Sequence, residues 1–289
     1  MFRVIDESRL LVELERITKT WVETSYIPDG FYLVFAELLL DFVEIYVCEN
    51  NYFGFICSWC DFVDKHDVSR FNLTGLVKYL EKNTFNQYKK FFSSYKSDYL
   101  NELRRHRANE ARNKKSLERK LSQAIKRYSK SEVVRIDLAY QQGCHDGISI
   151  HRFYNEFMVF RNLISKSISP FNSLVDYFWA LEQGETKGYH CHLLFVFDGH
   201  KRQKGWGVAD SIGRCWKDIT NNEGCYFNCH DPAQIKKYSE LGILGIGRIH
   251  RDNNEEVDRM LKTARYLVSP EKESQHLRVK TNLKMRTFQ

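Results

Sequence analysis

Two histidines separated by one residue lie in the segment GYHCHLLFVFD, residues 188–198. The segment is otherwise apolar and aromatic, which predicts a buried β-strand. Because alternate side chains of a strand point to the same face, His190 and His192 project together. Two imidazoles on one face can ligate a single metal ion, or they can form a hydrogen-bonded pair at a strand edge.

A second predicted strand, LVDYFWALEQ (174–183), precedes the histidines across the short segment GETKG. If this segment closes an antiparallel hairpin, Glu182 lies opposite His190 and Ala180 lies opposite His192. Directly opposed side chains share a face of the sheet. The hairpin then places a carboxylate beside the two imidazoles, with a small residue that leaves room for a ligand. Such a set with open coordination positions suits a divalent ion, Mn²⁺ or Mg²⁺.

A candidate nucleophile lies downstream, in the predicted helix NNEEVDRMLKTARYLV, residues 253–268. Tyr266 falls opposite the apolar side of this helix, near Lys262 and Arg259. A phenol ordinarily has a pKa of about 10, and a nearby cation or metal favours the reactive phenolate. An ordinary surface tyrosine would show the same pattern. The apolar side is formed by Val257, Met260, Leu261, Ala264, Leu267 and Val268.

These residues need a sheet flanked by helices to bring them together. Residues 1 to about 100 are rich in leucine and aromatic residues and are predicted to be mostly helical. The chain is therefore expected to have a mainly helical region over 1–130 and an α+β domain with an antiparallel sheet packed with helices over 131–289. In that domain, strands are predicted at 132–142, 174–183, 189–198 and 243–250, and helices at 149–168, 207–220 and 253–268.

The segment at the end of the helical region is strongly basic. Residues 101–130 contain 11 Lys or Arg against three Glu, an excess larger than the net charge of +7 of the whole chain. The segment has no Gly or Pro and suits one long helix. Such a helix could be a solvated connector, or it could contact the phosphates of a nucleic acid.

The sequence gives no sign of a membrane partner. Acidic residues interrupt the first 17 residues, so no signal peptide is expected. The most apolar stretch, GFYLVFAELLLDFVEIYVCENN, is interrupted by Glu37, Asp41 and Glu44 and is predicted to be a buried helix. The eight cysteines are therefore expected to be reduced thiols in a cytoplasmic protein.

The segment GYHCHLLF resembles the His-hydrophobic-His motif of HUH endonucleases, the rolling-circle replication initiators. Together with WALEQGETKG before it, ARYLV and a basic end with RTF, it is most similar to the inovirus gene-two-protein family and the related prophage YagK/YfjJ C-terminal domain. The order is VRIDLAY, the histidine strand and then the tyrosine helix, and it is more specific than any single motif. The resemblance covers about residues 130–289.

The resemblance implies an HUH endonuclease-like fold in which Glu182, His190 and His192 are metal ligands and Tyr266 is the nucleophile. It implies metal-dependent, site-specific nicking and rejoining of single-stranded DNA through a 5′-phosphotyrosine intermediate. The expected setting is the replication origin of a phage or prophage in the cytoplasm of a bacterial host, with host replication proteins as partners.

One position departs from the family pattern. Relatives commonly carry a lysine shortly after the tyrosine, where this chain has Ser269, with Lys272 three residues beyond. Lys262, one turn before the tyrosine, could take the place of that lysine in catalysis. The departure leaves open a non-catalytic DNA-binding regulator built on a degenerate HUH domain. A metallohydrolase of small substrates is a third reading, against which the basic helix and the tyrosine argue.

Overall fold

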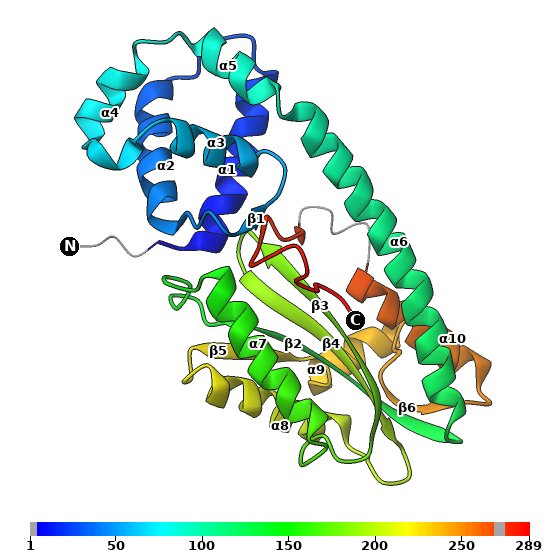
Figure 1. Cartoon of the computed structure of the whole chain (residues 1–289). Helices are drawn as coiled ribbons and strands as arrows, with labels where there is room; N and C mark the ends of the chain where they lie inside the picture. The colour runs from blue at the N-terminus through cyan, green and yellow to red at the C-terminus, as the bar shows by residue number, and fades with distance from the viewer. Residues whose placement is uncertain (1–4, 269–274) are drawn as a thin grey trace.

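A computed structural model of the chain describes residues 5–268 and 275–289. The N-terminal part is helical, as the sequence predicts, and the remainder combines helices with an antiparallel sheet (Figure 1). The first half contains α1 (Glu7–Glu23), α2 (Phe31–Ile45), β1 (Asn51–Tyr52), α3 (Ile56–Lys65), η1 (Val68–Arg70), α4 (Leu73–Leu80), α5 (Phe85–Ser93) and α6 (Lys96–Lys126). The second half contains β2 (Lys130–Tyr140), α7 (Ile150–Ser165), β3 (Leu174–Gly184), β4 (Gly188–Asp198), α8 (Gly205–Ile219), β5 (Gly224–Asn228), α9 (Pro232–Glu240), β6 (Gly247–His250), α10 (Asn254–Arg265), η2 (Tyr266–Val268) and β7 (Val279–Lys280).

The main sheet has the strand order β3-β4-β2-β5, and β6 also pairs with β2. Every pairing is antiparallel. β5 pairs with residues 136–140 of β2 and β6 pairs with residues 130–133, so the two short strands share one edge of β2. The long strands β4 and β2 therefore form the centre of the sheet, where both faces are covered.

The two faces of the sheet pack against different helices. Leu193 and Phe195 of β4 belong to the hydrophobic core that includes Phe157 of α7 and Trp216 of α8. The alternate residues of β4, such as Leu194, belong to a second core with side chains of α6 and α10. Since His190 and His192 are in phase with Leu194, they lie on the face covered by α6 and α10. Figure 1 shows α7 and α8 on one side of the sheet and α6 and α10 on the other.

The N-terminal helices are joined to the rest of the molecule through buried charged groups. Glu7 of α1 accepts hydrogen bonds from the Tyr189 hydroxyl (2.7 Å) and the Ile150 amide (2.8 Å), and burial raises its pKa to about 7. Glu15, also in α1, lies 2.7 Å from Nε of Arg278 and 3.3 Å from Nε2 of His276. Both partners belong to the C-terminal segment, residues 275–289, so α1 fixes that segment in place.

The main sequence predictions are confirmed and the details differ. The α+β class, the helical N-terminal region and the hairpin register are all as expected, with Glu182 opposite His190 and Ala180 opposite His192. The predicted helix at 253–268 ends at Arg265 and continues as one 3₁₀ turn from Tyr266. The strand predicted at 243–250 is shorter, and β5 and α9 were not predicted. The domain boundary near residue 130 stays a prediction.

No helix within residues 5–268 and 275–289 is both long and apolar enough to cross a membrane. The apolar stretch at 30–51 forms α2, and its side chains Phe35, Leu39 and Phe42 are buried in the N-terminal core.

We predict that Glu15→Gln destabilises the fold by about 3 kcal/mol, because it leaves the buried guanidinium of Arg278 without its carboxylate. Although burial raises the pKa of Glu15, His276 and Arg278 lower it well below its usual range. The loss should therefore be complete at neutral pH and shrink as the pH falls through the acidic range. Chemical denaturation at several pH values measures it. Glu13→Gln, in an exposed pair with Arg16, is the matched control and should change stability by less than about 0.5 kcal/mol.

Candidate metal and nucleophile site

Glu182, His190 and His192 meet on the sheet face covered by α6 and α10. Nε2 of His190 lies 3.5 Å from Oε2 of Glu182, and Nε2 of His192 lies 3.2 Å from the same oxygen. All three side chains are buried. Within the described part of the chain, they are the one group of three or more His, Cys, Asp or Glu whose ligand atoms, all within 4.8 Å of one another, could hold a metal ion.

The other nitrogen of each imidazole is held in place. Nδ1 of His190 lies 3.0 Å from the carbonyl oxygen of Gly188, which can only accept, so Nδ1 carries the proton. Nδ1 of His192 lies 2.7 Å from Oδ1 of Asp137, which β2 places directly opposite on the other side of β4. Both Nε2 atoms are thereby directed at Glu182. Metal-binding histidines have this arrangement, in which one nitrogen contacts an acceptor and the other faces the metal. The donor set therefore fits a divalent ion.

The charges of the site compensate one another. Burial by itself lowers the pKa of His192, but Asp137 and Glu182 raise it above its ordinary value. Burial raises the pKa of Asp137, yet His192 and Arg135 lower it to about 2. In the metal-free protein, His192 therefore tends to hold a proton between two carboxylates. A bound cation would take the place of that proton, so metal affinity should rise with pH.

Tyr266 lies at the border of this site. It begins the 3₁₀ turn after α10, and its side chain is 48% exposed. Its ring centroid is 6.0 Å from that of His192, and the guanidinium carbon of Arg135 lies 4.6 Å from the centre of the tyrosine ring. The structure therefore brings all three predicted ligands and the predicted nucleophile together. Lys262, the other residue predicted for catalysis, is exposed one turn earlier on α10.

A cavity of about 460 Å³ opens beside Tyr266, here called the tyrosine-side cavity. Three cationic side chains line it: Arg135, Lys187 and Lys262. Lys187 comes from the turn of the β3–β4 hairpin. The hairpin therefore contributes a cation to this cavity as well as the three candidate metal ligands. The remaining lining residues are Asp137, Phe227, Cys229, Tyr238, Ile243, Gly245, Ile246, Thr263 and Tyr266.

Sequence reasoning missed Arg135 and Asp137. The pattern did contain a signal, because these two charges are two residues apart in the stretch VVRIDL, residues 133–138, whose other residues are Val, Ile and Leu. Charges at alternate positions of a buried strand point to one face and need partners there. Ser269 and Lys272, which bear on the missing family lysine, lie outside the described residues.

The model of the YagK/YfjJ C-terminal domain family matches residues 97–282. The chain belongs to this family. The match begins well before residue 130, where the sequence resemblance begins, and so includes α6 in the YagK/YfjJ C-terminal domain. It also includes Glu182, His190, His192 and Tyr266. Searches of curated proteins and of solved structures found no match.

We predict that Asp137→Asn weakens Mn²⁺ binding by about 10- to 100-fold, because the carboxylate orients the His192 ring. The same change should lower the pKa of His192 in the metal-free protein, since Asp137 raises it. Calorimetry measures the affinity and NMR titration measures the pKa. His192→Ala should abolish the binding, whereas His200→Ala, a histidine distant in the β4–α8 connection, should leave it unchanged. Unaltered Mn²⁺ affinity in folded His192→Ala protein would exclude this metal site.

Proposed function

We propose that the chain is a rolling-circle DNA replication initiator that nicks and rejoins single-stranded DNA at a specific site. Tyr266 would be the nucleophile, Glu182, His190 and His192 would hold Mn²⁺ or Mg²⁺, and Lys262 would assist catalysis. The observation that carries the proposal is the position of Tyr266. Its ring lies 6.0 Å from that of a candidate metal ligand and lines an open cavity with three cations.

The residue types fit phosphodiester cleavage. Three cations of the tyrosine-side cavity suit the negative charge of a DNA backbone. A divalent ion in the Glu182 site would polarise the scissile phosphate and stabilise charge that develops in the transition state. The fit of the cavity to phosphate thus favours a nuclease over a metallohydrolase of small substrates.

The groups of the chain would act as follows. The Tyr266 oxygen attacks phosphorus and forms the new O–P bond, while the bond from phosphorus to the 3′-oxygen of the preceding nucleotide breaks. The phenolic proton is lost from the nucleophile, and the departing 3′-oxygen gains a proton to become a free hydroxyl. Arg135, stacked on the tyrosine ring, holds the ring at the border of the cavity. The phosphotyrosine link conserves the bond energy, so the reverse attack by a 3′-hydroxyl rejoins the strand without ATP.

The released 3′-hydroxyl would prime DNA synthesis, which is the role of an initiator at a replication origin. Host replication proteins in a bacterial cytoplasm would extend it, and the encoding element would be a phage or prophage related to the inoviruses. The basic face of α6 would hold the strand through its phosphates. Arg104, Arg105, Lys115 and Arg119 of this helix are exposed.

We predict that Tyr266→Phe lowers cleavage by several orders of magnitude while stability and DNA affinity change little. The substitution keeps the ring and its contact with Arg135 and removes only the nucleophilic oxygen. The test incubates the protein with Mn²⁺ and a randomised single-stranded library, and sequencing identifies the cut strands. Wild-type protein should also form a denaturation-resistant adduct that peptide mass mapping places on Tyr266.

Tyr238→Phe is the matched control, because Tyr238 lines the same cavity. An adduct on Tyr238 would keep the reaction and overturn the choice of Tyr266. Cleavage without any covalent adduct would mean that water is the nucleophile, and the initiator proposal would then be wrong. Metal binding and DNA binding with no cleavage at all would favour the alternative of a non-catalytic DNA-binding regulator.

We further predict that neutralising the basic face of α6 weakens DNA binding and reduces its salt dependence. Each lost phosphate contact should reduce the slope of log affinity against log salt by about 0.7. Fluorescence anisotropy at several salt concentrations measures the slope. Neutralising Lys65, Arg70, Lys78 and Lys82 in the N-terminal helices is the control, and an unchanged slope in the α6 variant would make α6 a solvated connector. The residues changed to Gln in α6 are Arg104, Arg105, Lys114, Lys115, Arg119 and Lys120.

A further inference from the structure

The side chains on the buried side of α6 are apolar near both ends of the helix and polar in its middle. Apolar or aromatic residues point inward near its beginning, at Tyr99 and Leu103, and again from Leu117 onward. Between them, at the same helical spacing of three and four residues, the positions are polar. These positions hold His106, Glu110 and Asn113, each partly buried.

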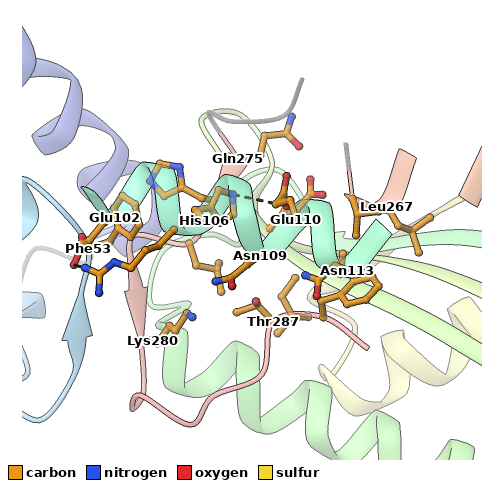
Figure 2. Close-up of a pocket in the computed structure, with 18 of the residues that line it drawn as sticks. Phe53, Glu102, His106, Asn109, Glu110, Asn113, Leu267, Gln275, Lys280 and Thr287 are labelled. Carbon is orange, nitrogen blue, oxygen red and sulfur yellow. Dashed lines mark ion pairs between the residues drawn. The ribbon is translucent and has the colours of Figure 1, made fainter. Parts of the chain in front are cut away.

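A cavity of about 400 Å³, here called the α6 cavity, lies over this polar interval. Its walls are α6, the end of β3, η2, the C-terminal segment and two residues of the N-terminal region, Asn51 and Phe53. Figure 2 shows Asn109 and Asn113 of α6 on the side that faces Lys280 and Thr287. Glu182 also lines the cavity, so the cavity begins where the candidate metal site ends.

The three polar residues at these positions give a less stable helix packing than apolar residues would. Apolar side chains at these three positions would continue the stripe and close the gap beneath the helix. His106 and Glu110 face each other at 3.7 Å, which accounts for two of the positions. The Asn113 side chain has no hydrogen-bond partner among the residues that the structure describes. A half-buried amide without a partner beside a cavity indicates a ligand that supplies one.

The lining indicates what kind of ligand this is. Three carboxylates, from Glu102, Glu110 and Glu182, outnumber the two cations that line the cavity, Arg105 and Lys280, and so disfavour a phosphate there. Amides both donate and accept hydrogen bonds, as the edges of nucleobases do, and apolar walls suit the faces of the bases. The neutral polar side chains are those of Asn51, Asn109, Asn113, Gln275 and Thr287, and the apolar ones include Phe53, Leu267, Val268 and Phe288.

We propose that the α6 cavity binds one base of the single-stranded DNA and thereby contributes to the choice of cleavage site. This inference rests on the proposed function and adds the source of its sequence specificity. Because Glu182 belongs both to the candidate metal site and to the cavity wall, the base belongs to a nucleotide next to the scissile phosphate. The phosphate lies against the cations of the tyrosine-side cavity, and the base enters between α6 and the C-terminal segment.

Asn113→Leu tests the proposal, because it extends the apolar stripe toward Leu117. The variant should be at least as stable to heat as the wild type and should lose the preference for one base at one position of the strand. The expected loss of preference is about tenfold or more. The selection uses a randomised single-stranded library with protein that also carries Tyr266→Phe, so bound strands stay intact and are sequenced. Asn101→Leu, on the exposed side of the same helix, should keep every preference.

The outcomes separate this inference from the proposed function. An unchanged base preference in Asn113→Leu, with Asn113→Ala giving the same result if the leucine variant does not fold, would overturn the base pocket. If bound strands show the preference and Asn113→Leu removes it, but wild-type protein cuts nothing, the base pocket stands and the nicking proposal fails. If the protein binds no single-stranded DNA, both are wrong.

Discussion

The register of the β3–β4 hairpin is the constraint on which the candidate site depends. It places Glu182 opposite His190 and Ala180 opposite His192. A slip of one residue would turn both histidines toward α7 and α8, into a core of stacked aromatic rings. That core holds the register, since Tyr189, Cys191 and Leu193 are buried in it at alternate positions. The aromatic packing on one face thus determines the chemistry available on the other.

A second register, between β4 and β2, supplies a carboxylate for the second nitrogen of His192, which the hairpin does not provide. It sets Asp137 against His192, and Arg135 follows two residues away on the same face. Asp137, His192 and Arg135 are all largely buried here, and burial of any of them alone would be costly. Arg135 lies 3.7 Å from Asp137 and stacks on Tyr266, so one guanidinium both neutralises the carboxylate and contacts the phenol. Neutralising the site and positioning the tyrosine are therefore linked through Arg135.

Local patterns made much of this predictable from the sequence. Alternation along 174–198 and the short segment GETKG between the strands were sufficient for the hairpin and for Glu182, because its register depends only on neighbouring residues. The partner of β4 on its other side was not predictable, since Asp137 is 55 positions from His192. The apolar side of 253–268 predicted the exposure of Tyr266, whereas the local pattern did not predict the change from α-helix to 3₁₀ turn at that residue, where η2 packs against both α6 and β3. Its contact with Arg135 needed the assembled sheet.

The α6 cavity has the least local origin of all, because its walls come from five separate parts of the chain, from Asn51 and Phe53 to the C-terminal segment. Its C-terminal wall is fixed by Glu15 of α1, through Arg278 and His276, and by Gln183, which accepts from the Arg278 amide at 2.8 Å. The amide of Gln183 also donates to the carbonyl of Ser8 in α1. Gln183 is the neighbour of Glu182, so one stretch of β3 contacts the helical region, the C-terminal segment and the candidate metal site. The N-terminal region thus helps to shape the α6 cavity, because α1 fixes the C-terminal wall and Asn51 and Phe53 line the cavity directly. A helical region whose role the sequence left open is in this way connected to the site by two adjacent residues of one strand.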